Sequence, residues 1–383
     1  MMSFAAVCRR SMPLALPGLL LLSACPPKVN IPEQYIEKVG VLAPLRADVG
    51  EVREEDEERH THKILEAVYG KLAKEYPPKE VDHMPRDAHQ KMHGCVVGTF
   101  TVVDNLNACF QHGVFKEPGK SYPLIVRYSN SDANVQTDKT PDARGMALKL
   151  LGVDGEKLIP GEKDATTHDF MLLNADRFFV RDLKTYVGML QALEMGKAEL
   201  AAWLATHPYE AGILLEAFGQ TMQNPVLHRY NSATPYLLGD EAVKWEAMPC
   251  VPPPPQVVDK KHPNYLHDAM KKTLATEDVC YDFYALRRSV PENMPIEDAT
   301  VAWPRKQTER VRLARIHIPK QRFDTKVRHE ACENYSFTPW HALPEHKPLG
   351  AVNRARYSVY ELISRFRNHE NGVPHVEPTA LPE

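Results

Sequence analysis

Between residues 94 and 180, apolar residues occur in short runs or alternate with polar ones. The segments with this pattern are 94–105, 122–130, 144–153 and 168–180. Gly, Pro and Asp residues separate them, as expected for β-strands joined by turns. Similar segments occur later in the chain, at 234–248, 279–289 and 309–318. The first of these is typical of a hairpin that turns at Gly239 and Asp240.

Three other segments place apolar residues at helical spacing, namely 63–76, 183–222 and 353–369. The second is expected to break near Pro208, because proline cannot continue a helix. The third has an apolar face made of Val359, Leu362, Ile363 and Phe366. Many strands with helical insertions predict an α+β fold, in which an antiparallel barrel or sandwich is decorated with helices.

The first 24 residues resemble a bacterial lipoprotein signal peptide. Arg9 and Arg10 precede an apolar stretch at 12–22, which is too short to span a bilayer. Leu22-Ser23-Ala24-Cys25 resembles the lipobox at which such signals are cleaved. We therefore expect a lipidated Cys25 that anchors the protein to a membrane of the bacterial cell envelope. A plain secretory signal is the alternative.

Residues 25–78 are predicted to form a tether and an N-terminal helix, ahead of a main domain at 79–383. The tether contains an acidic run between Glu51 and Glu58. Such charge runs usually form solvated spacers, and that is the expectation here.

Composition excludes several classes of protein. With 43% hydrophobic and 25% charged residues, the chain matches neither disordered nor multi-span membrane proteins. Its 47 Lys and Arg against 50 Asp and Glu give a net charge of −3, so there is no basic excess for nucleic-acid binding.

The cysteines indicate little about the function of the chain. Beyond Cys8 and Cys25, five cysteines remain, which are Cys95, Cys109, Cys250, Cys280 and Cys332. No C-x-x-C pattern occurs among them, so a zinc ribbon or a redox motif is not expected. One or two disulfides are compatible with an exported protein, and the sequence does not pair them.

The last predicted helix carries candidate chemistry. Arg356 and Tyr360 are four residues apart, and Arg367 follows seven later, so all three share one helix face. A guanidinium beside a phenol favours the phenolate, and a phenolate can ligate ferric haem iron. Spacing alone fits surface decoration equally well.

Four more motifs precede this helix. They are Arg86-x-x-His89-x-Lys91, Arg127-Tyr128-Ser129, Asp142-x-Arg144-Gly145, and Asn174 followed by Phe178-Phe179-Val180-Arg181-Asp182. Each motif also has a purely structural interpretation, in which the histidines lie at the start of a strand and the arginines form ion pairs with carboxylates.

Taken in order, the motifs resemble the catalase superfamily over roughly residues 80–370. The resemblance is closest to the short, divergent branch of catalase-like haem proteins, which includes peroxidase-like and allene-oxide-synthase-like members. It implies an antiparallel catalase-like β-barrel with helical insertions and a C-terminal haem-ligating helix.

The resemblance also implies roles for individual residues around a haem b cofactor. His89 would be the distal histidine that moves protons, and Asn174 would polarise the peroxide. Tyr360 would ligate the haem iron, with Arg356 as its partner. The remaining cofactor-binding residues would be Arg86, Arg127 and Arg367 at the propionates and Ser129 at the distal histidine.

Two departures from the family pattern matter for this assignment. A one-residue insertion lies between His89 and the strand that contains Gly98, which makes His93 a rival distal residue. The family's distal asparagine falls on Leu173 when counted without gaps, and Asn174 stands one position later.

We therefore expect a membrane-tethered, haem-dependent oxidoreductase that processes hydroperoxides in a catalase-like or peroxidase-like manner, as in an oxidative stress response. One alternative is lipid hydroperoxide conversion of allene-oxide-synthase type, although Ala88 stands where coral enzymes of that type have a hydroxyl residue. Another is a non-catalytic haem-binding lipoprotein. The sequence leaves a homo-oligomer open.

A metal site formed by the remaining histidines is the weakest alternative. It would use His60, His62, His83 and His89. Their spacing matches no standard zinc pattern.

Overall fold

The structure is a computed structural model, and it describes residues 31–32, 44–81, 83–252 and 260–383. The predicted signal peptide and Cys25 lie outside the described residues.

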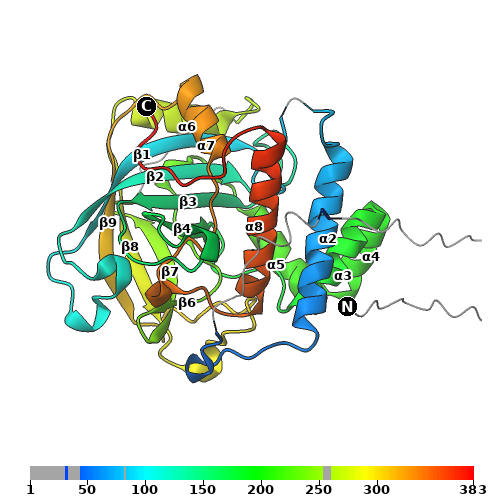
Figure 1. Cartoon of the computed structure of the whole chain (residues 1–383), viewed down its shortest axis with the longest axis horizontal. Helices are drawn as coiled ribbons and strands as arrows, with labels where there is room; N and C mark the ends of the chain where they lie inside the picture. Colours follow the sequence, from blue (N-terminus) through cyan, green and yellow to red (C-terminus); the bar gives the residue numbers. More distant parts are fainter. Residues whose placement is uncertain (1–30, 33–43, 82, 253–259) are drawn as a thin grey trace, which may run out of the picture. The chain divides into compact units, whose positions relative to one another are not determined.

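One antiparallel sheet forms the centre of the fold (Figure 1). Its strands are β1 (Met92–Val102), β2 (Ser121–Asn130), β3 (Arg144–Leu151), β4 (Thr167–Leu173), β5 (Tyr230–Asn231), β6 (Tyr236–Leu238), β7 (Glu241–Pro249), β8 (Val279–Arg287) and β9 (Arg310–Ile318). The order is β5-β4-β3-β2-β1-β9-β8-β7-β6, and a pairing of β5 with β7 closes the barrel. The predicted α+β class with an antiparallel barrel is confirmed.

The barrel interior is filled by side chains. Phe100, Phe115, Phe170, Trp245 and Phe283 pack together there, and their ring centroids lie 4.9–6.2 Å apart. Because this space is a packed core, chemistry has to take place on the outside of the barrel wall or under the helices that cover it.

A β-bulge explains the irregular pattern in the segment predicted at 309–318. Phe283 pairs with Ala314, whereas the next residue, Tyr284, pairs with Arg312. Leu313 is therefore the extra residue, and both Leu313 and Ala314 are fully buried.

Seven α-helices occur among the described residues. They are α2 (Glu57–Glu75), α3 (Leu183–Met195), α4 (Lys197–Thr206), α5 (Pro208–Gly219), α6 (Tyr265–Leu274), α7 (Lys326–Asn334) and α8 (Ala351–Glu370). The predicted helix at 63–76 begins six residues earlier, and the helical stretch from 183 breaks at Gly196 as well as at Pro208. In Figure 1, α8 lies beside the barrel with α2 next to it, and α2 and α3 pack together.

The acidic run before α2 is not a solvated spacer, so that prediction is wrong for the residues described. Glu51 and Glu57 are 2% and 4% exposed, and both contact the Arg354 guanidinium of α8 at 2.8–2.9 Å. Arg354 is itself 2% exposed and also contacts Glu297. A buried guanidinium needs compensating carboxylates, and the acidic run supplies two of them.

Two disulfides tie distant segments together. Cys95 in β1 is bonded to Cys332 in α7, and Cys250 after β7 is bonded to Cys280 in β8. Cys109 is free and exposed. The disulfide pairing could not be predicted from the sequence, because five cysteines allow many combinations.

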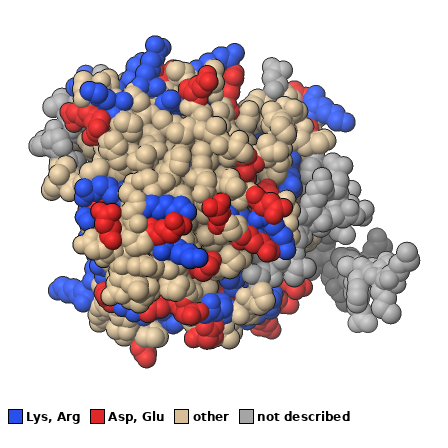
Figure 2. Space-filling model, turned by 60° about the vertical axis from the view of Figure 1, so that its left-hand side comes forward, with Lys and Arg blue, Asp and Glu red and all other residues tan. Residues whose placement is uncertain are grey.

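The surface is mixed in charge. On the face shown in Figure 2, Lys and Arg side chains are interspersed with Asp and Glu, and neither sign covers a large continuous area. Within the described part of the chain, every helix is too short or too polar to cross a membrane.

Candidate active site

Strand β2 presents two candidate residues on the outer side of the barrel. Val126 and Tyr128 point into the core, so Arg127 and Ser129, which alternate with them, point outward. Opposite Ser129 on β3 stands Gly145. The wall is therefore hollowed beside Ser129, because glycine has no side chain.

The predicted distal histidine occupies this hollow. His89 Nδ1 lies 3.0 Å from Ser129 Oγ, and a Cβ added at Gly145 would come within 2.8 Å of the His89 ring. The His89 carbonyl accepts a hydrogen bond of 2.9 Å from Arg127 Nη2. Burial and the nearby guanidinium of Arg127 lower the pKa of His89 to about 3, so the imidazole is neutral near pH 7.

The rival histidine faces a different environment. Met92 pairs with Ser129 and Gly94 with Tyr128, so His93 is the extra residue of a β-bulge and accounts for the insertion seen in the sequence. Its Nε2 lies 2.7 Å from Asn130 Oδ1, and the residue is 1% exposed. Burial lowers the pKa of His93 to about 3 as well.

Asn174 lies directly after β4, at the same end of the barrel as His89. Its Oδ1 accepts a hydrogen bond of 2.8 Å from the Arg144 N–H, and its Nδ2 donates to Gln220 Oε1 at 3.3 Å. The neighbouring pair Gly145 and Leu173 links β3 to β4 here. Asn174 is therefore one ladder position from the glycine that touches His89.

Helix α8 provides the predicted tyrosine and its partner. Arg356 Nη2 donates a hydrogen bond of 3.2 Å to the Tyr360 hydroxyl oxygen, and Arg356 Nη1 is held by Asn353 Oδ1 at 3.0 Å. Burial opposes the charge of Arg356, but Tyr360 and Tyr236 outweigh it and raise the pKa of the guanidinium. The pair is thus built to stabilise negative charge on the phenol oxygen.

The three predicted propionate arginines meet at the end of α7. Arg86 Nη2 donates to the carbonyl oxygens of Cys332, Glu333 and Tyr335 at 2.6–3.1 Å. Arg367 donates to the last two of these carbonyls. Arg127 Nη2 lies 2.9 Å from the Glu333 carboxylate.

Charge in this arginine cluster is incompletely balanced. Burial opposes ionisation of Glu333, but Arg127, Arg86 and Arg367 outweigh it and lower its pKa to about 2. Burial together with the like charge of Arg127 lowers the pKa of Arg367 to about 10, even with Glu333 nearby. Asp87 also acts on Arg86 and Arg367, so three guanidiniums face two carboxylates and one positive charge is in excess.

The two ends of the site are close enough to interact electrostatically. The positive charge of Arg356 acts on His89, and Tyr186 of α3 lies in the field of both Tyr360 and Asp87. Each of these side chains is strongly desolvated, yet each keeps some accessible surface.

These residues fit a haem group. The excess positive charge of the arginine cluster suits the propionates of haem, and the buried Nε atoms of Arg86 and Arg127 make no hydrogen bond to any described residue. The Tyr360 oxygen provides an axial ligand of the type that haem proteins use.

Sequence reasoning missed three residues of this site. Gly145 was part of a motif to which no chemistry was assigned, and its signal becomes visible only once β3 is paired with β2. Glu333 and Tyr186 belong to helices whose placement the sequence does not give.

The structure does not gather the histidines of the metal-site alternative. His60 lies in α2, His62 pairs with Glu66, and His89 pairs with Ser129. The groups of described residues that could hold a metal contain none of His60, His62, His83 and His89.

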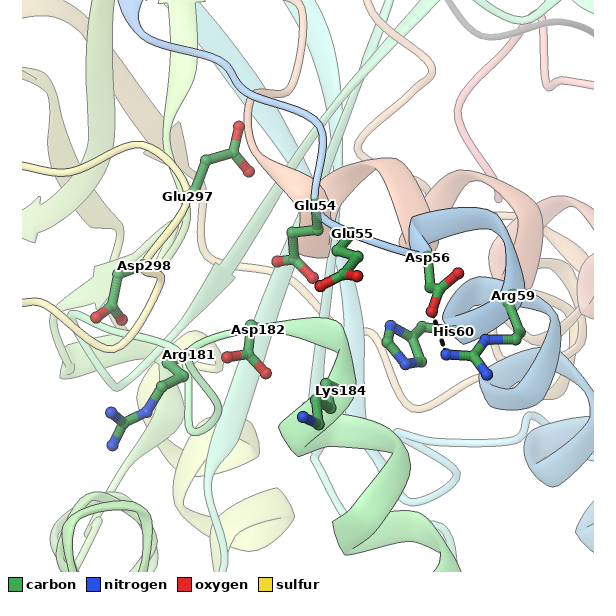
Figure 3. Close-up of a pocket in the computed structure, with 10 residues that line it drawn as sticks. All are labelled: Glu54, Glu55, Asp56, Arg59, His60, Arg181, Asp182, Lys184, Glu297 and Asp298. Atoms are coloured by element: carbon green, nitrogen blue, oxygen red, sulfur yellow. Dashed lines mark hydrogen bonds and ion pairs between the residues drawn. The ribbon is translucent and has the colours of Figure 1, made fainter.

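A separate pocket of about 570 Å³ lies where the segment before α2 meets the start of α3 (Figure 3). Its lining includes Glu54, Asp182 and Glu297. Burial and these neighbouring carboxylates raise the pKa of Glu54 to about 7. None of the predicted site residues lines this pocket.

Comparison with known proteins agrees with this geometry. The catalase family model matches residues 80–202, which contain His89, Arg127, Ser129 and Asn174. A catalase of Staphylococcus epidermidis is 27% identical over 125 residues, which cover 31% of this chain and 23% of that enzyme.

Solved catalase structures are similar over a larger part of the chain. Catalase A from Saccharomyces cerevisiae superposes with a TM-score of 0.61 at 16% identity, and a fungal catalase does so with 0.59 at 17%. Both alignments cover 79% of this chain, and they cover 64% and 62% of those proteins. The chain has the catalase fold.

The catalase relationship covers only part of the relatives. The alignments span less than two thirds of the catalases compared, so their activities do not carry over to this chain without further argument. The structural match covers 79% of this chain and so extends past residues 80–202, the segment that the family model matches.

Proposed function

We propose that this chain is a haem-dependent oxidoreductase that acts on hydroperoxides, with haem b as its cofactor. The observation that carries the proposal is the Arg356–Tyr360 pair on α8, whose guanidinium charge also lowers the pKa of His89. A surface tyrosine would need neither a desolvated guanidinium nor a neutral imidazole nearby.

In this proposal the chain's own residues bind and orient the cofactor. Tyr360 would ligate the haem iron through its phenol oxygen, to which Arg356 donates a hydrogen bond. Arg86, Arg127 and Arg367 would hold the propionates through their positive charge. When bound, haem supplies the redox centre at which a peroxide O–O bond is cleaved.

His89 does the acid–base work. Its neutral imidazole accepts a proton from the peroxide oxygen that approaches and returns it to the oxygen that leaves. The contact between Nδ1 and Ser129 Oγ fixes the ring, so Nε2 remains for the substrate. Asn174 is proposed to polarise the peroxide, although its amide in the structure is held by Arg144 and Gln220.

We also propose that the protein is exported and anchored to the bacterial cell envelope through a lipidated Cys25. The support is the Leu22-Ser23-Ala24-Cys25 motif, together with two disulfides, since disulfides persist in oxidising compartments outside the cytoplasm.

A spectrum and an assay on one preparation test the proposal. The purified protein should show a Soret band and should consume hydrogen peroxide faster than a fatty-acid hydroperoxide. A faster reaction with the fatty-acid hydroperoxide would favour lipid hydroperoxide conversion. A Soret band without either reaction would leave a haem-binding protein, and no Soret band after reconstitution with haem would overturn the proposal.

A further inference from the structure

A cluster of buried histidines and carboxylates lies outside the candidate active site. Its members come from four segments of the chain, and they are Glu162, His341, Glu361 of α8 and His375 of the C-terminal tail. Donor atoms of the first three lie within 4.8 Å of one another. His375 Nε2 lies 3.0 Å from Glu162 Oε1.

The orientation of His341 is fixed from one side. Its Nδ1 lies 2.9 Å from Asp169 Oδ2, and Asp169 is held in turn by the Thr338 N–H at 3.0 Å and by Lys149 at 2.8 Å. A carboxylate that binds one imidazole nitrogen sets the tautomer and leaves the lone pair of Nε2 free, as in carboxylate–histidine–zinc triads. His341 Nε2 faces Glu162.

The polar atoms on the two sides of the His341 ring differ in how completely they are hydrogen-bonded. On the Nδ1 side, the Glu377 carboxylate accepts hydrogen bonds from Thr167 and Ser336. On the Nε2 side, His341 Nε2 contacts one oxygen of Glu162 and His375 Nε2 lies 3.0 Å from the other, and none of these buried atoms makes a hydrogen bond of regular geometry. Buried polar atoms that converge without hydrogen bonds need an explanation, and an ion is one.

The charge balance of the cluster also favours a bound cation. Four carboxylates lie around His341, of which Asp169 and Glu361 are buried and Glu162 and Glu377 are partly buried, whereas the permanent cations beside them are Lys149 and Arg365. Two negative charges therefore remain when both histidines are neutral. One divalent cation or two protonated histidines would balance them.

We propose that this cluster is a zinc-class divalent metal site whose ligands are His341 Nε2, His375 Nε2, Glu162 and Glu361. Imidazole nitrogen and carboxylate oxygen in a set of four suit a tetrahedral zinc ion. The second half of the cluster, Asp169 with Lys149, orients His341 and does not bind the ion.

Such a site would hold α8 in place. Glu361 follows Tyr360 directly but projects about 100° around the helix, away from the candidate axial ligand. The metal would join α8 to the turn Pro160–Glu162, to the loop that carries His341 and to the tail that carries His375. This role is independent of peroxide chemistry.

Metal analysis of the purified full chain tests the proposal. Zinc should be found at about one equivalent per chain in addition to haem iron, which a haem assay counts separately. After removal with a chelator, Zn²⁺ titrated against a chromophoric competitor should rebind, and the melting temperature should rise by several degrees.

Three variants locate the site. His375→Ala, which removes a side chain that is 13% exposed, should weaken zinc binding at least about tenfold while the protein stays folded. Asp169→Asn should weaken it by about 10–100-fold through the orientation of His341. His317→Ala removes an exposed histidine beside Asp278 and should leave binding unchanged.

A folded wild-type chain that binds no zinc under these conditions would overturn the metal site and leave a network of protonated histidines and carboxylates. Zinc binding that is indifferent to both His375→Ala and Asp169→Asn would also overturn it.

Discussion

His89 is held by contacts that come from other elements. Ser129 of β2 bonds its Nδ1, and Gly145 of β3 leaves room for its ring. The residue itself has a φ of 58°, a left-handed conformation that is unusual for histidine and that the surrounding contacts maintain. The hollow beside β2 therefore selects the position of the ring.

His89→Ala should slow the peroxide reaction by about 10² or more while haem content stays near normal, because a general acid–base group is lost. Since the pKa of His89 is lowered to about 3, the wild-type rate should not fall through protonation of this residue between about pH 5 and about pH 8. Stopped-flow rates per haem measure both effects. His93→Ala should be milder, and the reverse ranking would move the distal role to His93.

Gly145→Ala should lower the peroxide rate without loss of haem, since the new Cβ would come within 2.8 Å of the His89 ring. The ring must shift, and its contact with Ser129 is lost. Gly212→Ala is the matched control, because a Cβ there meets nothing within 4 Å. Equal rates for the two variants would show that the ring is not positioned by this glycine.

At the residue scale, the sequence identified the candidate functional residues but not the residues that position them. Arg356 and Tyr360 could be paired from helical spacing alone, and their hydrogen bond is present. Gly145 and Glu333 could not be found in that way, because their importance arises from strand pairing and from the position of α7. Nor could spacing separate His89 from His93, since the bulge at His93 is a property of the β1–β2 ladder.

At the scale of elements, α8 connects the site to the rest of the molecule. Arg356 contacts Tyr360, Arg354 is buried against the segment before α2, and Glu361 lies in the histidine–carboxylate cluster. These residues project in different directions around one helix, so each contact restrains its rotation.

Arg354→Leu should destabilise the protein by about 3–5 kcal/mol, because Glu51 and Glu57 would remain buried without a guanidinium partner. Urea unfolding measures the loss. Arg315→Leu is the control: its side chain is 52% exposed and pairs with Asp282, so it should cost no more than about 1 kcal/mol. Similar losses for both variants would contradict the buried network.

The positions of helices and strands were predicted correctly where the sequence has a clear helical or strand periodicity. The hairpin at Gly239 and Asp240 is present, with Leu238 paired to Glu241 across the turn. Helices α6 and α7 were missed, because each is short. The acidic run was misread because its charges suggested solvent, whereas the partner that buries them lies about 300 residues away in the sequence.

At the scale of the whole molecule, the barrel class could be predicted, because many segments with strand-like alternation are compatible with few other folds. The closure between β5 and β7 was not, since these strands of two and nine residues pair through a single short ladder. The position of α8 beside the barrel likewise depends on long-range packing, which no local pattern encodes.

Cys25→Ser should release the protein from membranes, because the proposed lipid anchor is attached at that thiol. Fractionation after salt and carbonate washes measures this, with Cys109→Ser, at a free and exposed cysteine, as the control. A Cys25→Ser protein that stays wholly in the membrane fraction would rule out the lipobox.

Tyr360→Phe tests the central claim most directly, because phenylalanine keeps the ring and removes only the oxygen that Arg356 contacts at 3.2 Å. The measurement is the visible spectrum of the purified variant beside that of the wild type, with peroxide consumption per haem recorded on the same samples. If Tyr360 is the axial ligand, haem should be lost or change spin state and the peroxide rate should collapse. A Tyr360→Phe protein that purifies with full haem, an unchanged charge-transfer spectrum and wild-type activity would contradict the proximal assignment and the proposed hydroperoxide chemistry with it.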